Sequence, residues 1–470
     1  MFKPSAITLA LSLVLFPAPQ QAVEINKIEL PDMGDSSGTL ITPAEEKEFG
    51  EAFFRSLHSQ ISINQDAEIQ EYIQSIGQKL AANSDAPSHP FHFFVVMEDD
   101  INAFAGPGGY IGVNSGLILM TEAESELASV MAHEIAGRLS IPTVAATLAA
   151  ILLGTQSPAL GQAAIMAIQA GSVQFQIDFT RENEEEADRV GMQTLAGSQF
   201  DPRSMPTFFE RLQQSTRYYG QAIPEFLRTH PVTASRISDT RGRAETYPYK
   251  QYPDSLGYQL TKAKIRVLTA TDTAEAHKYF QSRLTQGTLE QRTVARYGMG
   301  LIALNGQKYK EAESIFQSLT KEYPEQPQYA TALARTALDS RNYNTALDRY
   351  QKLVEQFPDN EAIKLEYITS LLKAGKTEQA RKNLFSLNPQ TQQLPVYWQL
   401  LAQVYSNLNQ PAESHRYLAE YYYAMGQTKD AILQIRLAQE SKGLNFQLSS
   451  ILSERLNFFL TQEQEARRNR

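Results

Sequence analysis

The sequence predicts a mainly helical α+β protein in two parts: a domain with a small sheet, followed by an all-α solenoid of repeats. Three observations support this fold class. The chain has 470 residues, too many for a single hydrophobic core. Its first half combines helical periodicity with two short strand-like runs, at 91–97 and 110–113. Its second half repeats at a fixed interval.

The N-terminus has the layout of a secretory signal peptide. A positively charged start at 1–3 precedes an apolar run at 6–16 and a small or polar exit. The apolar run is too short to span a bilayer. The alternative, a buried N-terminal helix, is weaker because Pro follows directly after Phe16. We therefore expect a signal peptide at 1–22, cleaved near Ala22, and export of the chain.

The next elements are an extended segment at 23–42 and two amphipathic helices, at about 43–60 and 66–83. After the two strand-like runs, Thr121 is expected to begin another helix. It is a good N-cap, and Glu124, three residues on, completes a capping box.

That helix carries His133 and Glu134, and Gly137 and Pro142 favour its early end. Two apolar stretches follow, at 139–154 and 158–171, both shorter than a membrane span. We expect buried or surface-docked helices there, with peripheral membrane contact as the alternative.

A further helix is expected at 181–197, and from about 290 the chain repeats every 34 residues. The positions that recur at this interval are Tyr309 and Tyr343, Ala312, Ala346 and Ala380, and Pro324 and Pro358. This is the period of the tetratricopeptide repeat, a helix-turn-helix unit that buries its apolar face on its neighbours.

Composition limits the classes of function. The net charge of −9 argues against nonspecific nucleic-acid binding, so no nucleic-acid partner is expected. Because the chain has no cysteine, a thiolate metal site and a lipid anchor on cysteine are both excluded. His, Asp and Glu remain as the strong metal ligands.

The segment 133–137 reads His-Glu-Ile-Ala-Gly and resembles an incomplete zinc motif. In the pattern His-Glu-x-x-His, two ligands share one helix face and the Glu is the general base. Gly137 stands where the second His belongs. Glu184 is the candidate for a further ligand, and Asp188 for a carboxylate that hydrogen-bonds the first His. In isolation, the acidic run around Glu184 is more typical of a solvated helix face than of a metal site.

Several motifs together indicate a family. They are Gly34-Asp35-Ser36-Ser37-Gly38, Asn102-Ala103-Phe104-Ala105, Pro107-Gly108-Gly109, Gly116-Leu117, His133-Glu134, Glu184 with Ala187-Asp188-Arg189 and Gly191, and Thr229-His230-Pro231. With the repeats, the chain resembles the membrane-associated and periplasmic zinc metallopeptidases of the gluzincin type, the family that includes HtpX. The resemblance implies a zincin-type metallopeptidase domain at 43–260, a tetratricopeptide domain at 261–465 and a periplasmic location.

The resemblance also implies the roles of individual residues. One Zn²⁺ is expected, with His133 and Glu184 as ligands, Glu134 as general base and Asp188 as a supporting acid. His230 is expected on a loop that occupies the open zinc position. It is either a removable switch or, since Gly137 replaces a ligand, a permanent substitute. The segment of Tyr110, Ile111, Gly112 and Val113 resembles the edge strand on which such peptidases bind an extended substrate.

Two functions follow. The first is a periplasmic zinc metalloendopeptidase and chaperone that acts on misassembled outer-membrane proteins, with the repeats docked on the β-barrel assembly machinery. The second is a catalytically impaired pseudo-peptidase that acts as an adaptor or chaperone through its repeats. Gly137 favours the second, and about a dozen residues after it are missing by comparison with the family pattern.

Overall fold

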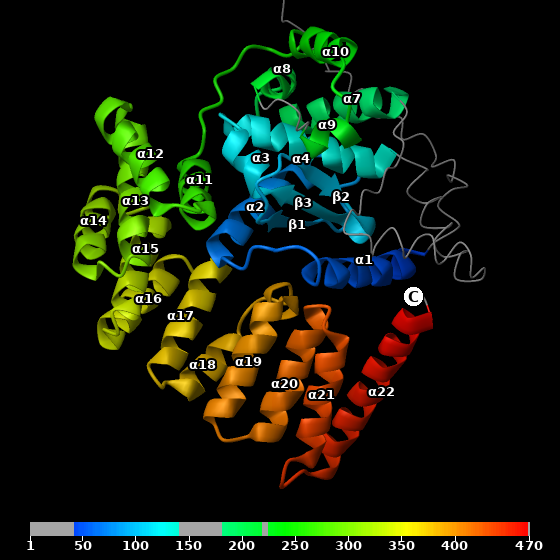
Figure 1. Cartoon of the computed structure of the whole chain (residues 1–470), viewed down its shortest axis with the longest axis vertical. Helices are drawn as coiled ribbons and strands as arrows, with labels where there is room; N and C mark the ends of the chain where they lie inside the picture. The colour runs from blue at the N-terminus through cyan, green and yellow to red at the C-terminus, as the bar shows by residue number, and fades with distance from the viewer. Residues whose placement is uncertain (1–41, 141–180, 219–223, 469–470) are drawn as a thin grey trace, which may run out of the picture.

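The computed structural model describes residues 42–140, 181–218 and 224–468 (Figure 1). The predicted signal peptide at 1–22, the segment up to residue 41 and the apolar stretches beyond Ser140 lie outside the described residues. Among the helices that are described, none combines the length and apolarity needed to cross a membrane.

The sheet has three strands in the order β1-β3-β2, where β1 is His92–Val96, β2 is Ala103–Ala105 and β3 is Tyr110–Asn114. β3 pairs parallel with β1 and antiparallel with β2. Side chains alternate between the two faces, as strand geometry requires. Phe93 and Val95 enter the main core, whereas Phe94 and Val96 pack on the other face.

Two helices cover the sheet from opposite sides. α1 (Pro43–His58) begins with a capping box at Thr42 and packs Phe53 and Leu57 on one face. α2 (Ala67–Ala81) begins at the N-cap Asp66 and buries Ile69, Ile73 and Leu80 in the main core on the other face. Both helices lie where the hydrophobic periodicity predicts them.

The prediction that a helix begins at Thr121 is wrong. Thr121 ends the short helix α3 (Ser115–Met120), and the next helix, α4 (Glu124–Ser140), begins three residues later. The Thr121 hydroxyl bonds to the Ile118 carbonyl and to Tyr258, so it is not available as a cap. The Glu124 carboxylate accepts hydrogen bonds from Tyr72 and Ser255 instead of closing a capping box.

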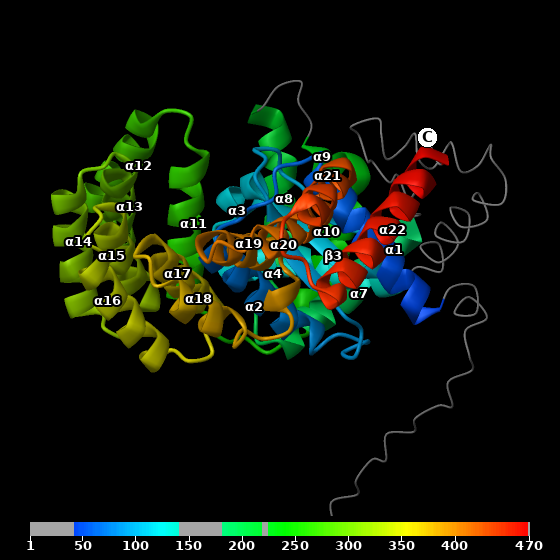
Figure 2. The same ribbon diagram turned by 90° about the horizontal axis from the view of Figure 1, so that it is seen from below.

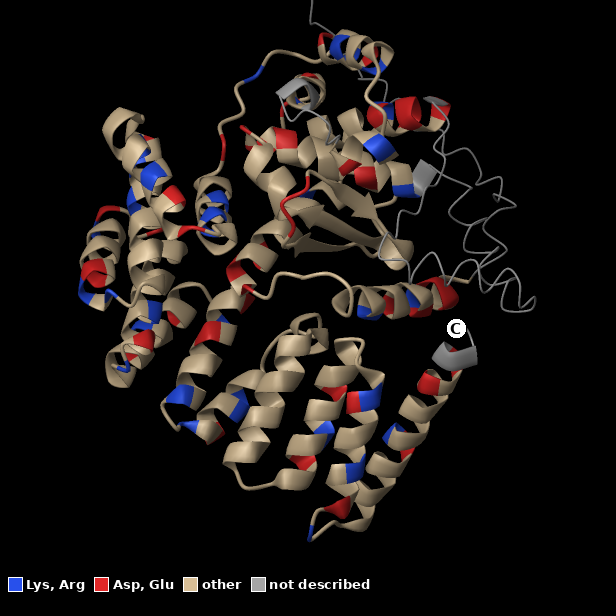
Figure 3. Ribbon diagram, viewed as in Figure 1, with Lys and Arg blue, Asp and Glu red and all other residues tan. Residues whose placement is uncertain are grey.

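Four more helices are described in the first part of the chain: α7 (Arg181–Gly197), α8 (Ser204–Tyr218), α9 (Glu225–Thr229) and α10 (Ala234–Ala244). The expected helix at 181–197 is therefore confirmed by α7. Acidic positions gather on α7 and basic ones on α10 beside it (Figure 3). A 3-10 turn, η1 (Pro107–Gly109), joins β2 to β3.

The rest of the described chain is helical. The elements are α11 (Leu256–Thr269), α12 (Thr273–Gln286), α13 (Leu289–Asn305), α14 (Tyr309–Glu322), α15 (Pro327–Asp339), α16 (Tyr343–Gln356), α17 (Glu361–Lys373), α18 (Thr377–Leu384), the 3-10 turn η2 (Thr391–Gln393), α19 (Pro395–Asn407), α20 (Pro411–Ala424), α21 (Thr428–Glu440) and α22 (Phe446–Arg468).

The 34-residue period is visible in the backbone. Left-handed residues with positive φ recur at Gln307, Arg341, Gly375, Asn409 and Gly443, each in the turn between two helices of a repeat. Ala312, Ala346 and Ala380 are fully buried, because a small side chain is needed where paired helices approach. The repeat extends to α22, further along the chain than the side-chain pattern indicates.

The repeats curve around the first part of the chain. In Figure 1 they descend from α12 to α18 and turn beneath α1. Figure 2, which is seen from below, shows α17–α22 in front of the sheet-containing part. α11 contributes to both sides of the junction: Tyr258 and Ile265 enter the main core, and Leu260 and Ala263 enter the repeat core. The predicted boundary between 260 and 261 therefore falls inside a helix.

Candidate metal centre

Four elements bring charged and imidazole side chains together in a buried cluster. α4 supplies His133 and Glu134, and α7 supplies Glu184 and Asp188. His230 is the C-cap of α9, and Arg236 lies on α10. All six side chains are buried. Every residue for which the sequence predicts a role at the metal lies in this cluster, together with Arg236, for which it predicts none.

The close approach of α4 and α7 depends on Gly191. A Cβ at this position would lie 3.2 Å from the His133 backbone nitrogen and 3.3 Å from atoms of Ala132. Such contacts are tighter than ordinary packing, so a larger residue would push the helices apart. Glu184 and Asp188 are four residues apart on the α7 face that this glycine brings against His133.

Asp188 fixes the orientation of His133. Burial alone would raise the pKa of Asp188, but hydrogen bonds from Arg236 and His133 hold it below its ordinary value. The ionised carboxylate therefore accepts the His133 Nδ1 proton across 2.9 Å. The Nε2 lone pair of His133 is thereby directed at His230 and Glu184. Burial opposes protonation of His133, yet Asp188 and Glu184 together raise its pKa.

Arg236 joins the two acids of α7. Its Nε and Nη2 donate to Asp188, each at 2.8 Å, and its Nη1 lies 2.7 Å from Glu184 Oε2. Nη1 also donates to the Pro231 carbonyl, which holds the loop after His230 in place. Two buried carboxylates require a cation nearby, but the sequence shows neither their burial nor which arginine reaches them.

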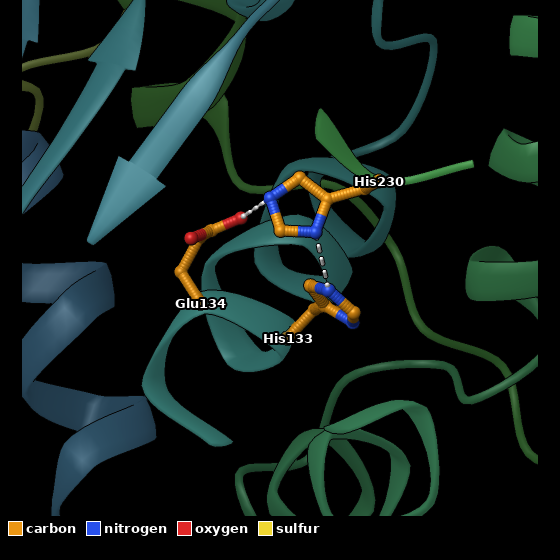
Figure 4. A group of neighbouring side chains, drawn as sticks. All are labelled: His133, Glu134 and His230. Carbon is orange, nitrogen blue, oxygen red and sulfur yellow. Dashed lines mark hydrogen bonds and ion pairs between the residues drawn. The ribbon is translucent and has the colours of Figure 1, made fainter. Parts of the chain in front are cut away.

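His230 lies between His133 and Glu134 (Figure 4) and also contacts Glu184. Its Nδ1 is 3.3 Å from His133 Nε2 and 3.0 Å from Glu184 Oε1, and its Nε2 is 3.6 Å from Glu134 Oε1. The Phe226 ring stacks on the imidazole with centroids 4.8 Å apart. The Phe226 amide donates to the Ile101 carbonyl just before β2, so α9 is tied to the sheet.

Glu134 has the surroundings of a carboxylate that takes up a proton easily. Burial raises its pKa, while His230, His133 and the Ala105 backbone amide oppose this shift. Its Oε1 makes no hydrogen bond within the described ranges and lies 3.6 Å from His230 Nε2. This oxygen therefore keeps lone pairs directed at the cluster, whereas Glu184 Oε2 is already paired with Arg236.

The donor set fits a divalent metal ion. His133, Glu134 and His230 offer ligand atoms that all lie within 4.8 Å of one another. Glu184 approaches both histidines more closely, at 3.6 Å from His133 Nε2 and 3.0 Å from His230 Nδ1. Ligands of tetrahedral zinc are about 3.3 Å apart when each bond is about 2.0–2.1 Å long. Three buried carboxylates against one arginine also leave a net negative charge that a divalent cation would neutralise.

Gly137 contributes no ligand. It is a buried residue of α4, one turn beyond His133, and the helix continues past it to Ser140. α4 therefore carries one histidine, His133, within the described residues. A metal would therefore be held by His133, Glu184 and His230 rather than by two histidines of α4.

The prediction that 110–113 forms an edge strand is wrong. Those residues belong to β3, the central strand, whose two edges are filled by β1 and β2. β2 is not predicted from the sequence, because three residues are too few to show an alternating pattern. Tyr110, Ile111, Gly112 and Val113 therefore have no backbone groups available to an extended peptide.

Within the described ranges, the edge of β2 that faces away from β3 pairs with no other strand. The residues that flank β2 bond to β3, Asn102 to Asn114 and Gly106 to Tyr110, so alternation turns the backbone groups of Ala103 and Ala105 outward. This edge faces α4, where the Ala105 amide contacts Glu134. The opposite edge of the sheet is covered, since Gln74 accepts from the Phe93 amide.

Comparison with known sequences agrees with the two-part fold. The profile of Peptidase family M48 matches residues 67–244, and two tetratricopeptide repeat profiles match 294–325 and 337–404. A mitochondrial metalloendopeptidase OMA1 of Schizosaccharomyces pombe is 31% identical over 173 residues, which are 35% of this chain and 50% of that protein. The predicted fold class is thereby confirmed.

Two relatives match almost the whole chain. The putative beta-barrel assembly-enhancing protease of Vibrio cholerae is 35% identical over 429 residues, 88% of each chain. The beta-barrel assembly-enhancing protease of Escherichia coli K12 is 33% identical over 417 residues, 86% of this chain and 85% of that one. With its M48 domain followed by tetratricopeptide repeats, the chain belongs to the family of the β-barrel assembly-enhancing proteases.

Proposed function

We propose that the chain is a periplasmic zinc metalloendopeptidase that acts in the quality control and assembly of outer-membrane β-barrel proteins. In this proposal His133, Glu184 and His230 hold the zinc ion. The observation that carries it is the convergence of their donor atoms within 3.0–3.6 Å of one another, although Gly137 supplies no ligand. His230 is then a permanent ligand rather than a removable switch.

The chain's own residues suit peptide hydrolysis. A bound zinc ion would polarise the scissile carbonyl and make water more acidic. Glu134, with its pKa raised by burial, is the base that takes a proton at Oε1 and returns it to the leaving amine. Asp188 and Arg236 hold His133 and Glu184 in place.

The edge of β2 that faces away from β3 is the proposed substrate site. A peptide that pairs with the outward groups of Ala103 and with the Ala105 carbonyl would add a strand to the sheet and pass beside Glu134, which already accepts from the Ala105 amide. The names of the relatives refer to β-barrel assembly, which supports unassembled β-barrel proteins, with their extended strands, as the proposed substrate class. The repeats are proposed to dock on the β-barrel assembly machinery.

The second candidate is a pseudo-peptidase that acts as an adaptor through its repeats. Gly137 favours it, and so does the 2.7 Å contact between Arg236 Nη1 and Glu184 Oε2, because the arginine already neutralises the candidate ligand. In this alternative the cluster is held together by Arg236 and needs no metal.

Zinc stoichiometry distinguishes the two candidates. The chain without residues 1–22 is dialysed against a mild chelator, and its zinc content is compared with that of Glu184→Gln and His230→Ala. The peptidase proposal predicts about one zinc per chain, lost in both variants. Glu134→Gln should keep the zinc but fail to cleave an unfolded β-barrel protein. Wild-type protein that retains no zinc would leave the adaptor function.

A further inference from the structure

α1 lies between the sheet and the last repeats (Figure 1). On the sheet side, Phe53 and Leu57 pack on the face formed by Phe94, Val96 and Phe104. The contact is closest at the turn from β2 to β3. A Cβ at Gly106 would lie 2.2 Å from Phe53, and one at Gly50 would lie 2.7 Å from the Gly108 Cα. No gap therefore separates α1 from the turn that ends β2.

On its other side α1 contacts the repeats. The Arg55 guanidinium lies 4.6 Å from the centre of the Tyr423 ring, at the end of α20. The next turn brings Gly426, with φ of +71°, against the backbone of α1. A Cβ there would lie 2.3 Å from the Arg55 carbonyl oxygen. The α20–α21 turn is thus seated directly on the last turn of α1.

α1 also contacts the helix that carries the candidate metal ligands. Glu46, in its first turn, forms an ion pair with Arg138 of α4, one turn after His133 and Glu134. One helix therefore contacts the repeats, the turn that ends β2 and the end of α4. Close-packed interfaces of this kind transmit small displacements instead of absorbing them.

We propose that α1 couples the last repeats to the strand edge beside Glu134. The α20–α21 turn packs on α1 and holds α1 against residues 106–109, which fix the end of β2. A partner that moves α20 and α21 therefore changes how rigidly β2 is held. That this coupling regulates peptide binding rests on the proposed function, whereas the coupling itself does not.

Hydrogen exchange on the full chain tests the coupling. Gly426→Ala places a methyl group against the Arg55 carbonyl at a position with left-handed backbone. Gly443→Ala is the matched control: it has φ of +82°, lies at the other end of α21 and has no atom within 4 Å of the new Cβ. We expect amide exchange at 103–114 to accelerate at least about fivefold in Gly426→Ala and to stay within about twofold in Gly443→Ala.

A second pair of variants reports on the same contact without backbone strain. Arg55→Ala removes the cation from the Tyr423 ring, and Arg416→Ala removes a similar cation, 4.7 Å from the Tyr417 ring, within the repeats. Only Arg55→Ala should accelerate exchange at 103–114. Equal exchange in Arg55→Ala and Arg416→Ala would overturn the proposal, even if Gly426→Ala fails to fold. The readout needs neither zinc nor cleavage, so a chain that binds no zinc still tests the coupling.

Discussion

At the scale of single residues, the cluster around His133 is stabilised by charge balance more than by any one bond. Arg236 is the residue on which this balance depends, because its planar fork reaches Asp188 through two nitrogens and Glu184 through the third. A lysine has one compact charge and lacks the planar fork that donates to Asp188 through two nitrogens and to Glu184 through a third. Substitution of Arg236 should therefore change the stability of the fold as well as the position of the proposed ligand Glu184.

Replacement of Arg236 by Met should destabilise the metal-free protein strongly. Glu184 and Asp188 would remain buried without their cation, and breaking a buried ion pair from one side costs about 3–5 kcal/mol. Urea unfolding of the chelator-treated protein measures this, and Arg236→Lys should lie between wild type and Arg236→Met. A loss below about 1 kcal/mol in Arg236→Met would show that the carboxylates are stabilised without the arginine.

A second residue-scale prediction concerns pH. Burial raises the pKa of Glu71 to about 7, with the charges of Glu68 and Glu361 adding to the shift. Between pH 4.5 and 7 the folded chain keeps a proton that the unfolded chain has released, so stability falls as pH rises through this window.

Glu71→Gln should abolish this dependence, because the amide is neutral at every pH. Relative to the variant, wild type should lose on the order of 2 kcal/mol between pH 5 and pH 8. Unfolding free energies of both chains at the two pH values measure the effect, and other titrating groups cancel in the difference. Parallel pH profiles of the two chains would contradict the prediction.

At the scale of elements, the site depends on how closely two helices approach. α4 carries His133, and α7 carries Glu184 and Asp188; Gly191 is the point where the backbones meet. The short helix α9 then positions His230 over this pair from a segment tied to Ile101. Binding of a metal at the proposed site would therefore be sensitive to substitutions that leave all three proposed ligands unchanged.

Gly191→Ala tests this dependence. Its new Cβ would lie 3.2 Å from the His133 nitrogen, and we expect a destabilisation of about 1–3 kcal/mol. Zinc affinity should fall about tenfold or more, since the displaced Asp188 no longer supports His133. Gly197→Ala, on the same helix with its nearest atom at 3.5 Å, is the control. Equal affinity in the two variants would mean that α7 adjusts without moving its carboxylates.

At the scale of the whole molecule, α11 belongs to both parts of the chain. Its Tyr258 is buried in the main core and bonds to Thr121, whereas Leu260 enters the repeat core. Lys264 of the same helix pairs with Asp66 and Glu68 at the start of α2. Cutting the chain within this helix would separate side chains from both cores.

The stability of fragments of the chain should depend on whether they contain α11. A fragment of residues 43–270, which keeps α11, should unfold at higher urea than one of residues 43–253. The shorter fragment exposes the pocket for Tyr258 and leaves Asp66 and Glu68 without Lys264. Equal stability would place the independent folding unit before residue 254.

Much of the candidate site was predictable from sequence, because its residues lie in short local motifs. His133 and Glu134 are adjacent, and Glu184 and Asp188 share one helix face, so these short motifs carry the family resemblance that singles them out. Their roles as ligands and base stay predictions. Arg236 was missed because an arginine becomes part of a site only through what it contacts, and those contacts join segments about 50 residues apart.

The sequence by itself determined the elements whose signals are local. The helices α1, α2 and α7 follow from periodicity and caps, and the repeats follow from their period, since each repeat buries its apolar face on its neighbours. The tertiary structure alone decided which strand is central, because β2 is recognised only by its pairing with β3. It also decided that His230 reaches His133 across 97 residues, because that contact depends on the packing of α9 against the sheet and α4.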